Sequence, residues 1–127
     1  MAFQTFEDLE VWKRGCRQAV AVCKLFNHCQ NWSLRDQIQR AAISVPSNIA
    51  EGQERDSRLD FIRFLRIAKG SNGEMRTQLY IAAQLELIPR EQLPPFAQES
   101  KEIAAMLQGL VNSLRRAGAK GSGRAEN

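Results

Sequence analysis

Mostly apolar residues recur in alternating steps of three and four near both ends of the chain, and this spacing is the strongest constraint on the fold. The first stretch contains Leu9, Trp12, Cys16, Ala19, Cys23 and Phe26, and the last contains Phe96, Ser100, Ile103, Leu107, Leu110 and Leu114. Such a heptad seam is typical of antiparallel helical bundles. No segment shows the period-two alternation that half-buried strands require. The pattern predicts an all-α, up-down-up-down antiparallel four-helix bundle.

Hydroxyl residues mark the expected helix starts. Each is followed three residues later by an aspartate, which gives the pairs Thr5–Asp8, Ser33–Asp36 and Ser57–Asp60. The hydroxyl can accept a bond from a first-turn amide, and the aspartate complements the helix dipole. Pro95 suits the first turn of the last helix. Together with the caps, it predicts helices at 6–29, 34–54, 58–87 and 95–117. We predict a bundle domain, residues 1–117, and a disordered C-terminal tail, residues 118–127.

The third predicted helix contains two glycines in its middle. Gly70 and Gly73 each cost about 1 kcal/mol relative to alanine in a helix. The apolar residues before and after them keep the same helical phase, which a turn would rarely preserve. We therefore predict one long helix in which the small residues let a neighbouring backbone come close.

Composition fits a single domain without a membrane segment. The chain has 127 residues, 43% of them hydrophobic, which is enough for one packed core. No run of about 18 apolar residues occurs, so we expect no transmembrane helix. The first residues, MAFQTFEDLE, are acidic and mixed, so we expect no signal peptide and a cytoplasmic protein. The net charge of +4 lies mostly near the C-terminus and says little about nucleic acid.

Residues for catalysis or metal binding do not form a recognisable set. The three cysteines, Cys16, Cys23 and Cys29, include no Cys-x-x-Cys pair and are interpreted as reduced core residues. The single histidine, His28, is expected at the polar end of the first helix. Neither a Ser-His-Asp set nor a phosphate-binding glycine loop can be assembled. The sequence predicts no enzyme activity, no catalytic residue, no cofactor and no metal.

The second predicted helix combines a proline with a polar row. Pro46 lacks the amide that would bond to the Ala42 carbonyl, so we predict a bend there. The row along one flank contains Gln37, Arg40, Ser44, Asn48, Glu51 and Arg55. It is either a solvated flank with a Glu51–Arg55 pair or a polar seam between subunits. In the second interpretation the oligomer-interface residues are Arg40, Ser44, Asn48, Glu51 and Arg55.

Two basic groups are candidates for nucleic-acid binding. They are Lys13, Arg17 and Lys24 in the first helix, and Arg63, Arg66 and Lys69 in the third. A single basic stripe is usually solvated surface. In a ring of identical subunits, however, the stripe would be repeated on one surface, and affinity for phosphates would rise with the number of charges.

The two segments WSLRDQIQRAAISVPSNIAEGQER and FIRFLRIAKGSNGEM carry a family resemblance. They resemble the four-helix-bundle family encoded in intervening sequences of bacterial 23S rRNA genes and, more distantly, the accessory variability determinant proteins of diversity-generating retroelements. The resemblance covers about residues 6–115 and implies a bundle that assembles into a ring, with five subunits. The matching residues are Arg40, Ser44, Pro46, Asn48, Glu51, Gly52, Arg63, Phe64, Gly70, Ser71 and Glu74.

Three functional hypotheses follow. The first is a non-enzymatic homo-oligomeric scaffold that binds RNA or an RNA-associated partner through basic surface. The second is a protein–protein adaptor ring with no nucleic-acid role. The third is a small-molecule pocket inside the bundle. Salt dependence separates the first two, because binding to phosphates weakens steeply as salt rises.

Overall fold

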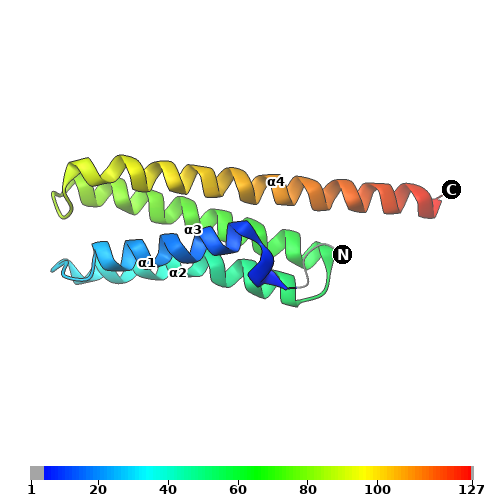
Figure 1. The fold of residues 1–127 in the computed structure, drawn as a ribbon, viewed down its shortest axis with the longest axis horizontal. Helices are drawn as coiled ribbons and strands as arrows, with labels where there is room; N and C mark the ends of the chain where they lie inside the picture. The colour runs from blue at the N-terminus through cyan, green and yellow to red at the C-terminus, as the bar shows by residue number, and fades with distance from the viewer. Residues whose placement is uncertain (1–4, 127) are drawn as a thin grey trace.

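The structure, a computed structural model, describes the backbone of residues 5–126 and the side chains of residues 5–119. It contains four long helices, α1 (Glu10–Leu25), α2 (Trp32–Glu54), α3 (Arg58–Gln84) and α4 (Leu93–Glu126), and two short 3-10 helices, η1 (Phe6–Asp8) and η2 (Arg90–Gln92). No strand occurs among these described residues. Figure 1 shows the helices side by side, each running opposite to the one before it. The prediction of an all-α four-helix bundle is confirmed.

Two of the three predicted helix starts differ in detail from the structure. At α3 the prediction is confirmed, because Ser57 Oγ accepts a bond from the Asp60 amide at 3.3 Å. At α2 the cap is Asn31, whose Oδ1 accepts from the Leu34 amide at 3.1 Å, so the prediction of Ser33 was wrong. The predicted Thr5–Asp8 pair forms, with the Thr5 amide donating to Asp8 Oδ2 at 3.4 Å, but it caps the short helix η1, and α1 begins only at Glu10.

The ends of α3 and α4 also depart from the prediction. α3 ends at Gln84 because Glu86 takes a left-handed backbone with φ of 59°, and the Leu87 amide bonds back to the Ala82 carbonyl at 2.9 Å. This is the closing turn that commonly ends helices. α4 begins at Leu93 and continues to Glu126, past the predicted end near Ala117. The division into a 1–117 domain and a 118–127 tail stays a prediction.

Pro46 lies within α2, which continues as one helix through this position. The proline is buried and faces α1, where a Cβ added to Gly15 would lie 3.5 Å from Pro46 Cβ. An added Cβ would make ordinary van der Waals contact with the ring, so α1 and α2 pack closely here without requiring glycine. The bend in α2 stays a prediction.

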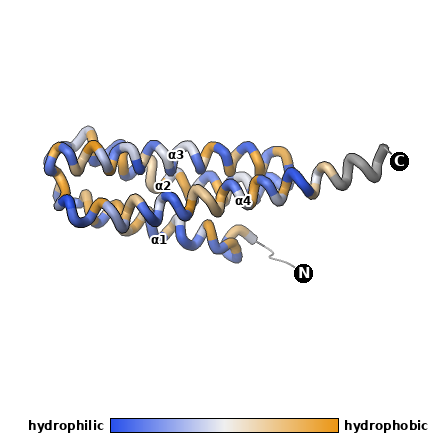
Figure 2. Tube along the Cα trace, turned by 90° about the horizontal axis from the view of Figure 1, so that it is seen from above, coloured by the Kyte–Doolittle hydropathy of each residue, from blue (hydrophilic) through white to orange (hydrophobic). Residues whose placement is uncertain are grey.

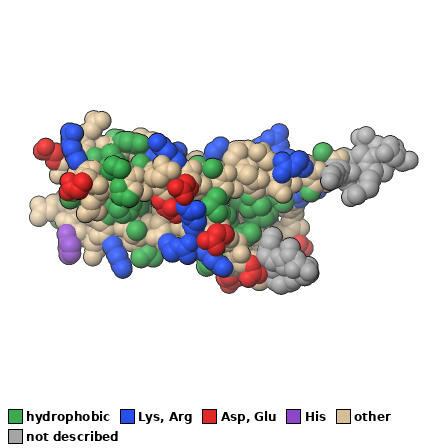
Figure 3. Space-filling model, turned by 45° about the horizontal axis from the view of Figure 1, so that its top comes forward, with side chains coloured by type: hydrophobic (Ala, Val, Ile, Leu, Met, Phe, Trp, Pro, Cys, Tyr) green, Lys and Arg blue, Asp and Glu red, His purple; other side chains and the backbone are tan. Residues whose placement is uncertain are grey.

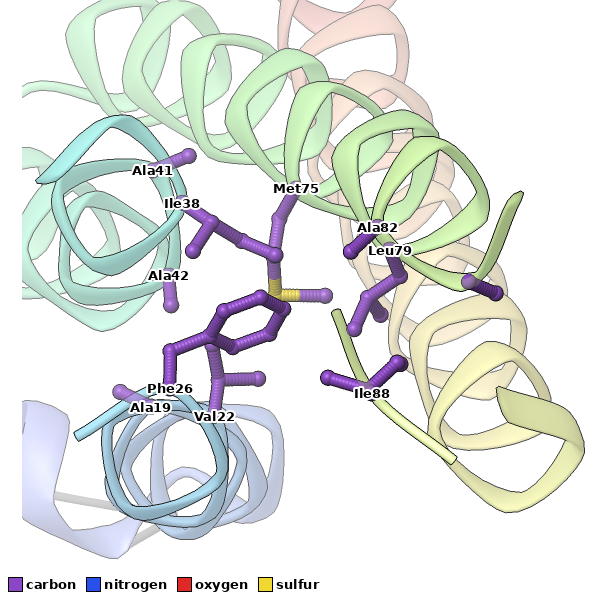
Figure 4. Close-up of a cluster of buried hydrophobic side chains, with 11 residues drawn as sticks. Ala19, Val22, Phe26, Ile38, Ala41, Ala42, Met75, Leu79, Ala82 and Ile88 are labelled. Carbon is purple, nitrogen blue, oxygen red and sulfur yellow. The ribbon is translucent and has the colours of Figure 1, made fainter. Parts of the chain in front are cut away.

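The hydrophobic core consists of two clusters along the bundle. One lies near the α1–α2 and α3–α4 connections and is drawn in Figure 4; it includes Val22, Phe26, Ile38, Met75 and Leu79. The other includes Val45, Ile49, Leu65, Ile103 and Leu107. Apolar and polar residues alternate along every helix in Figure 2, as expected when each helix buries one stripe.

A buried polar layer separates the two clusters. Gln18 of α1 donates through Nε2 to Asn72 Oδ1 of α3 at 3.1 Å. Asn72 Nδ2 donates to the Ser100 carbonyl of α4 at 2.8 Å, and Ser100 Oγ donates to Asn72 Oδ1 at 3.1 Å. Asn72 and Ser100 are fully buried. The layer therefore links three helices through buried polar side chains.

The two glycines of α3 play a different part from the one predicted. α3 is a single long helix, as expected, but a Cβ added to Gly70 or Gly73 would meet nothing within 4 Å. No neighbouring backbone uses the space, so that part of the prediction was wrong. The close approach occurs instead at Gly52 of α2, where an added Cβ would lie 2.6 Å from Phe64 Cβ of α3.

Candidate functional site

The polar row of α2 meets polar residues of α3 along the most extensive helix contact in the molecule. We call this the polar α2–α3 surface. It consists of Arg40, Ser44, Asn48 and Glu51 from α2 and Arg55 just after its end, with Arg63, Ser71 and Glu74 from α3. The five predicted interface residues thus lie on one surface. That they contact another subunit stays a prediction.

The centre of the surface is a chain of hydrogen bonds. Asn48 Nδ2 donates to both the Ser44 carbonyl and Ser44 Oγ at 2.8 Å. Because Ser44 Oγ accepts this bond, its own hydrogen is free to donate to Ser71 Oγ, 2.9 Å away on α3. The amide orientation of Asn48 is fixed, since a carbonyl can only accept. The chain of bonds orders these side chains within a single subunit.

A small pocket lies beside this chain. It has a volume of about 140 Å³ and is lined by Gln37, Arg40, Ala41, Ser44, Ser71 and Glu74. Arg40 and Glu74 are exposed and make no hydrogen bond or ion pair with the side chains that the structure describes. Opposite charges without partners, next to an ordered hydroxyl pair, can receive a polar or charged partner.

The other end of the surface is built on an aromatic ring. The Arg55 and Arg63 guanidiniums lie over the Phe64 ring, 4.8 Å and 4.5 Å from its centroid. Each arginine also pairs with an acid nearby in the sequence, Arg55 with Glu51 at 3.2 Å and Arg63 with Asp60 at 3.9 Å. Ring contact and ion pairs together hold both guanidiniums in place. Arg63, which the sequence analysis predicted to bind nucleic acid, therefore belongs to the polar α2–α3 surface.

The two predicted nucleic-acid groups do not form one surface. α1 and α3 each pack against α2 and α4 and lie diagonally across the bundle, so their outer faces point apart. On α1, Lys13 and Lys24 are exposed, while Arg17 pairs with Glu10 at 3.2 Å. On α3, Arg66 is exposed and Lys69 donates to Gln108 Oε1 at 2.8 Å. Figure 3 shows acidic and basic side chains interspersed on the face in view.

One electrostatic junction was missed from the sequence. Arg14 of α1 binds Glu99 and Glu102 of α4, with Nε 2.9 Å from Glu99 Oε2 and Nη2 2.6 Å from Glu102 Oε1. The bond from Arg14, helped by one from Gln98, lowers the pKa of Glu102 below its usual value. The pairing raises the pKa of Arg14. The junction connects α1 to α4, and the two carboxylates balance the positive charge of Arg14.

The described residues do not assemble an obvious catalytic or metal-binding site. They contain no group of three histidine, cysteine or acidic side chains placed to hold a metal. The three cysteines are free and only partly buried, and burial raises the pKa of the Cys16 and Cys23 thiols. No helix in the described part of the chain is long and apolar enough to cross a membrane.

Comparison with known proteins gives the family. The model of the 23S rRNA-intervening sequence protein family matches residues 7–109. The chain belongs to this family. A solved structure similar to this 23S rRNA-intervening sequence protein is a protein of unknown function from the S23 ribosomal protein family of Bacteroides thetaiotaomicron VPI-5482. The two share 29% identity and a TM-score of 0.75 over 80% of this chain and 95% of the other. No curated protein matches.

The matched region of this 23S rRNA-intervening sequence protein contains the whole polar α2–α3 surface. The α2 half of this surface was predicted from the spacing of its polar row. Ser71 and Glu74, in the α3 half, entered only through the resemblance and not as interface residues. The sequence does contain a pattern that could have indicated them. Ser71 lies four residues after Ile67 and Glu74 three residues after Ser71, so all three share one helix face.

Proposed function

We propose that this 23S rRNA-intervening sequence protein is a non-enzymatic, cytoplasmic homo-oligomer that serves as a scaffold for RNA or an RNA-associated partner. The observation that carries the proposal is the polar α2–α3 surface, with an ordered centre and the unpaired charges of Arg40 and Glu74. The family resemblance implies a closed ring of five. In such a ring this surface is in contact with a neighbouring copy.

Exposed apolar residues beside the polar surface support a contact between subunits. Ile43 of α2 is 50% exposed and Ile67 of α3 is 41% exposed. Ile43 lies three residues from Arg40, and Ile67 four residues from Ser71, so each shares a face with polar interface residues. A mixture of apolar contact with ordered polar groups is typical of protein interfaces.

The first prediction concerns the assembly. In light scattering at micromolar concentration, we expect a single species of about five times the 14.4 kDa chain mass. Arg40→Glu should shift this species toward monomer, because it places a second negative charge beside Glu74. Arg90→Glu, the same change on η2 away from the polar α2–α3 surface, should leave the mass unchanged. A wild-type mass of 14.4 kDa would contradict the proposed ring.

The basic surface that fits RNA best is on α1. Lys13 and Lys24 are exposed there and make no ion pair with described residues. Both are fixed on a helix, so binding would order little besides their side chains. If residues 118–127 form the disordered tail that the sequence predicts, each of them would cost about 1–2 kcal/mol to order. In a ring of identical subunits, each copy would add its own Lys13 and Lys24 to one surface, which would strengthen binding through multivalency.

The second prediction tests this with structured RNA in gel shifts at several salt concentrations. Lys13→Gln/Lys24→Gln should weaken binding more than deletion of residues 118–127. In a plot of log binding constant against log salt concentration, the slope should also become shallower by about 0.7–0.9 for each phosphate that the protein no longer neutralises. Arg90→Gln/Lys101→Gln removes the same charge elsewhere and should have little effect. If only the tail deletion abolishes binding, the α1 surface is not the RNA site. If no RNA binds at any salt, the adaptor ring replaces the scaffold.

A further inference from the structure

A groove opens between α1 and α4, away from the polar α2–α3 surface. Its volume is about 280 Å³, and its mostly apolar lining consists of Arg17, Gln18 and Ala21 from α1 with Pro95, Phe96 and Glu99 from α4. α1 and α4 make the sparsest contact of the neighbouring helices. The groove therefore lies where the bundle is least closely packed.

The charged residues at the groove already have partners. Arg17 pairs with Glu10 at 3.2 Å, and Glu99 accepts a bond from Arg14 Nε at 2.9 Å. A charged ligand would have to compete with these pairs. The chemistry of the groove thus favours a neutral ligand.

Gln18, which lines the groove, has one unpaired hydrogen-bond acceptor. Asn72 Nδ2 donates to the Ser100 carbonyl, so Asn72 must accept through Oδ1, and Gln18 must donate to it through Nε2. This fixes the Gln18 amide and leaves Oε1 without a donor among the described residues. Gln18 is only 4% exposed. An unpaired buried acceptor of this kind is rare in proteins.

We propose that this groove binds a small neutral aromatic molecule that carries one N–H or O–H donor. Its ring packs on Phe96, Pro95 and Ala21, and its donor bonds to Gln18 Oε1. Apolar cavities of about 150 Å³ can bind benzene, so a groove of about 280 Å³ has room for a two-ring compound such as indole. The site is distinct from the proposed subunit contact and from the lysines proposed to bind RNA.

Three probes test the role of Gln18 on the full-length chain by calorimetry or NMR titration. Indole should bind once per chain. 1-Methylindole lacks the donor and should bind at least about tenfold more weakly. 3-Methylindole has the same extra methyl group but keeps the N–H, so it should bind as well as indole. Equal binding of indole and 1-methylindole, or no binding of either, would overturn the proposal.

Two variants test the location. Ala21→Met fills the groove from an exposed position of α1 and should abolish indole binding, whereas Ala105→Met, the same change at an exposed position of α4 outside the groove, should not. Unchanged binding to Ala21→Met would place the ligand elsewhere. If Ala21→Met instead changes the mass in light scattering without ligand, a side chain of another copy occupies the groove and the small-molecule site is wrong.

Discussion

Replacing Gly52 with alanine should lower the free energy of unfolding by about 1–3 kcal/mol. The added Cβ would lie 2.6 Å from Phe64 Cβ and 3.2 Å from Phe61 Cδ1. Phe64 Cβ is next to the backbone of α3, so a side-chain rotation cannot remove the clash, and α2 and α3 must move apart. Separation there would also disturb the two guanidiniums over the Phe64 ring.

Gly70→Ala is the matched control for Gly52→Ala. It makes the same chemical change inside a helix, but nothing lies within 4 Å of the added methyl group. Because alanine is the better helix former, it should raise the free energy of unfolding by about 1 kcal/mol. Urea unfolding followed by circular dichroism at one protein concentration measures both. If the two variants shift stability in the same direction, the close approach at Gly52 does not limit packing.

Replacing Asn72 with alanine should lower the free energy of unfolding by about 2–5 kcal/mol, since buried groups left without partners cost about 1–3 kcal/mol each. Gln18 Nε2 and Ser100 Oγ would both lose their acceptor, Asn72 Oδ1. Asn72 is fully buried, so a small cavity would remain as well. The same urea experiment measures the effect.

A triple variant, Gln18→Leu/Asn72→Leu/Ser100→Ala, separates the effect of unpaired polar groups from the effect of packing. Removing all partners together leaves none of these side-chain groups unpaired, and this can be close to neutral for stability. We expect it to recover most of the stability that Asn72→Ala removes. A triple variant as unstable as the single one would show that the side-chain volumes of the layer, and not its hydrogen bonds, hold the helices.

The sequence predicted the helices better than the contacts between them. Heptad spacing predicted the first and last helices, and hydroxyl caps predicted the starts of the middle two. Ser57 was found as a cap because its aspartate partner is close in sequence. The buried face of α1 is rotated from the predicted seam. Trp12, Cys16 and Cys23 of that seam are only half-buried, and the fully buried residues include Val11, Gly15, Gln18 and Val22. The apolar stripe of α1 is wide because it packs against two neighbouring helices. A single sequence therefore does not show which residues lie at its centre.

The candidate site was predictable only in its α2 half. Arg40, Ser44 and Asn48 form a row that any helical projection shows. Ser71 joins them because of the register between α2 and α3, which depends on the packing of residues such as Gly52 against Phe64. Asn72 was missed as a core residue for the same reason, since its partners Gln18 and Ser100 lie on two other helices.

The buried amide of Asn72 also has a consequence for how the helices find their alignment. Sliding α4 along the bundle by one heptad would exchange Ser100 for Leu107 or Leu93, and the apolar stripe alone would scarcely oppose either slip. Only in the native alignment does Asn72 meet the carbonyl and hydroxyl of a serine. Polar groups at single core positions can fix register in this way in coiled coils. Here a single polar layer distinguishes one alignment of the bundle from its neighbours.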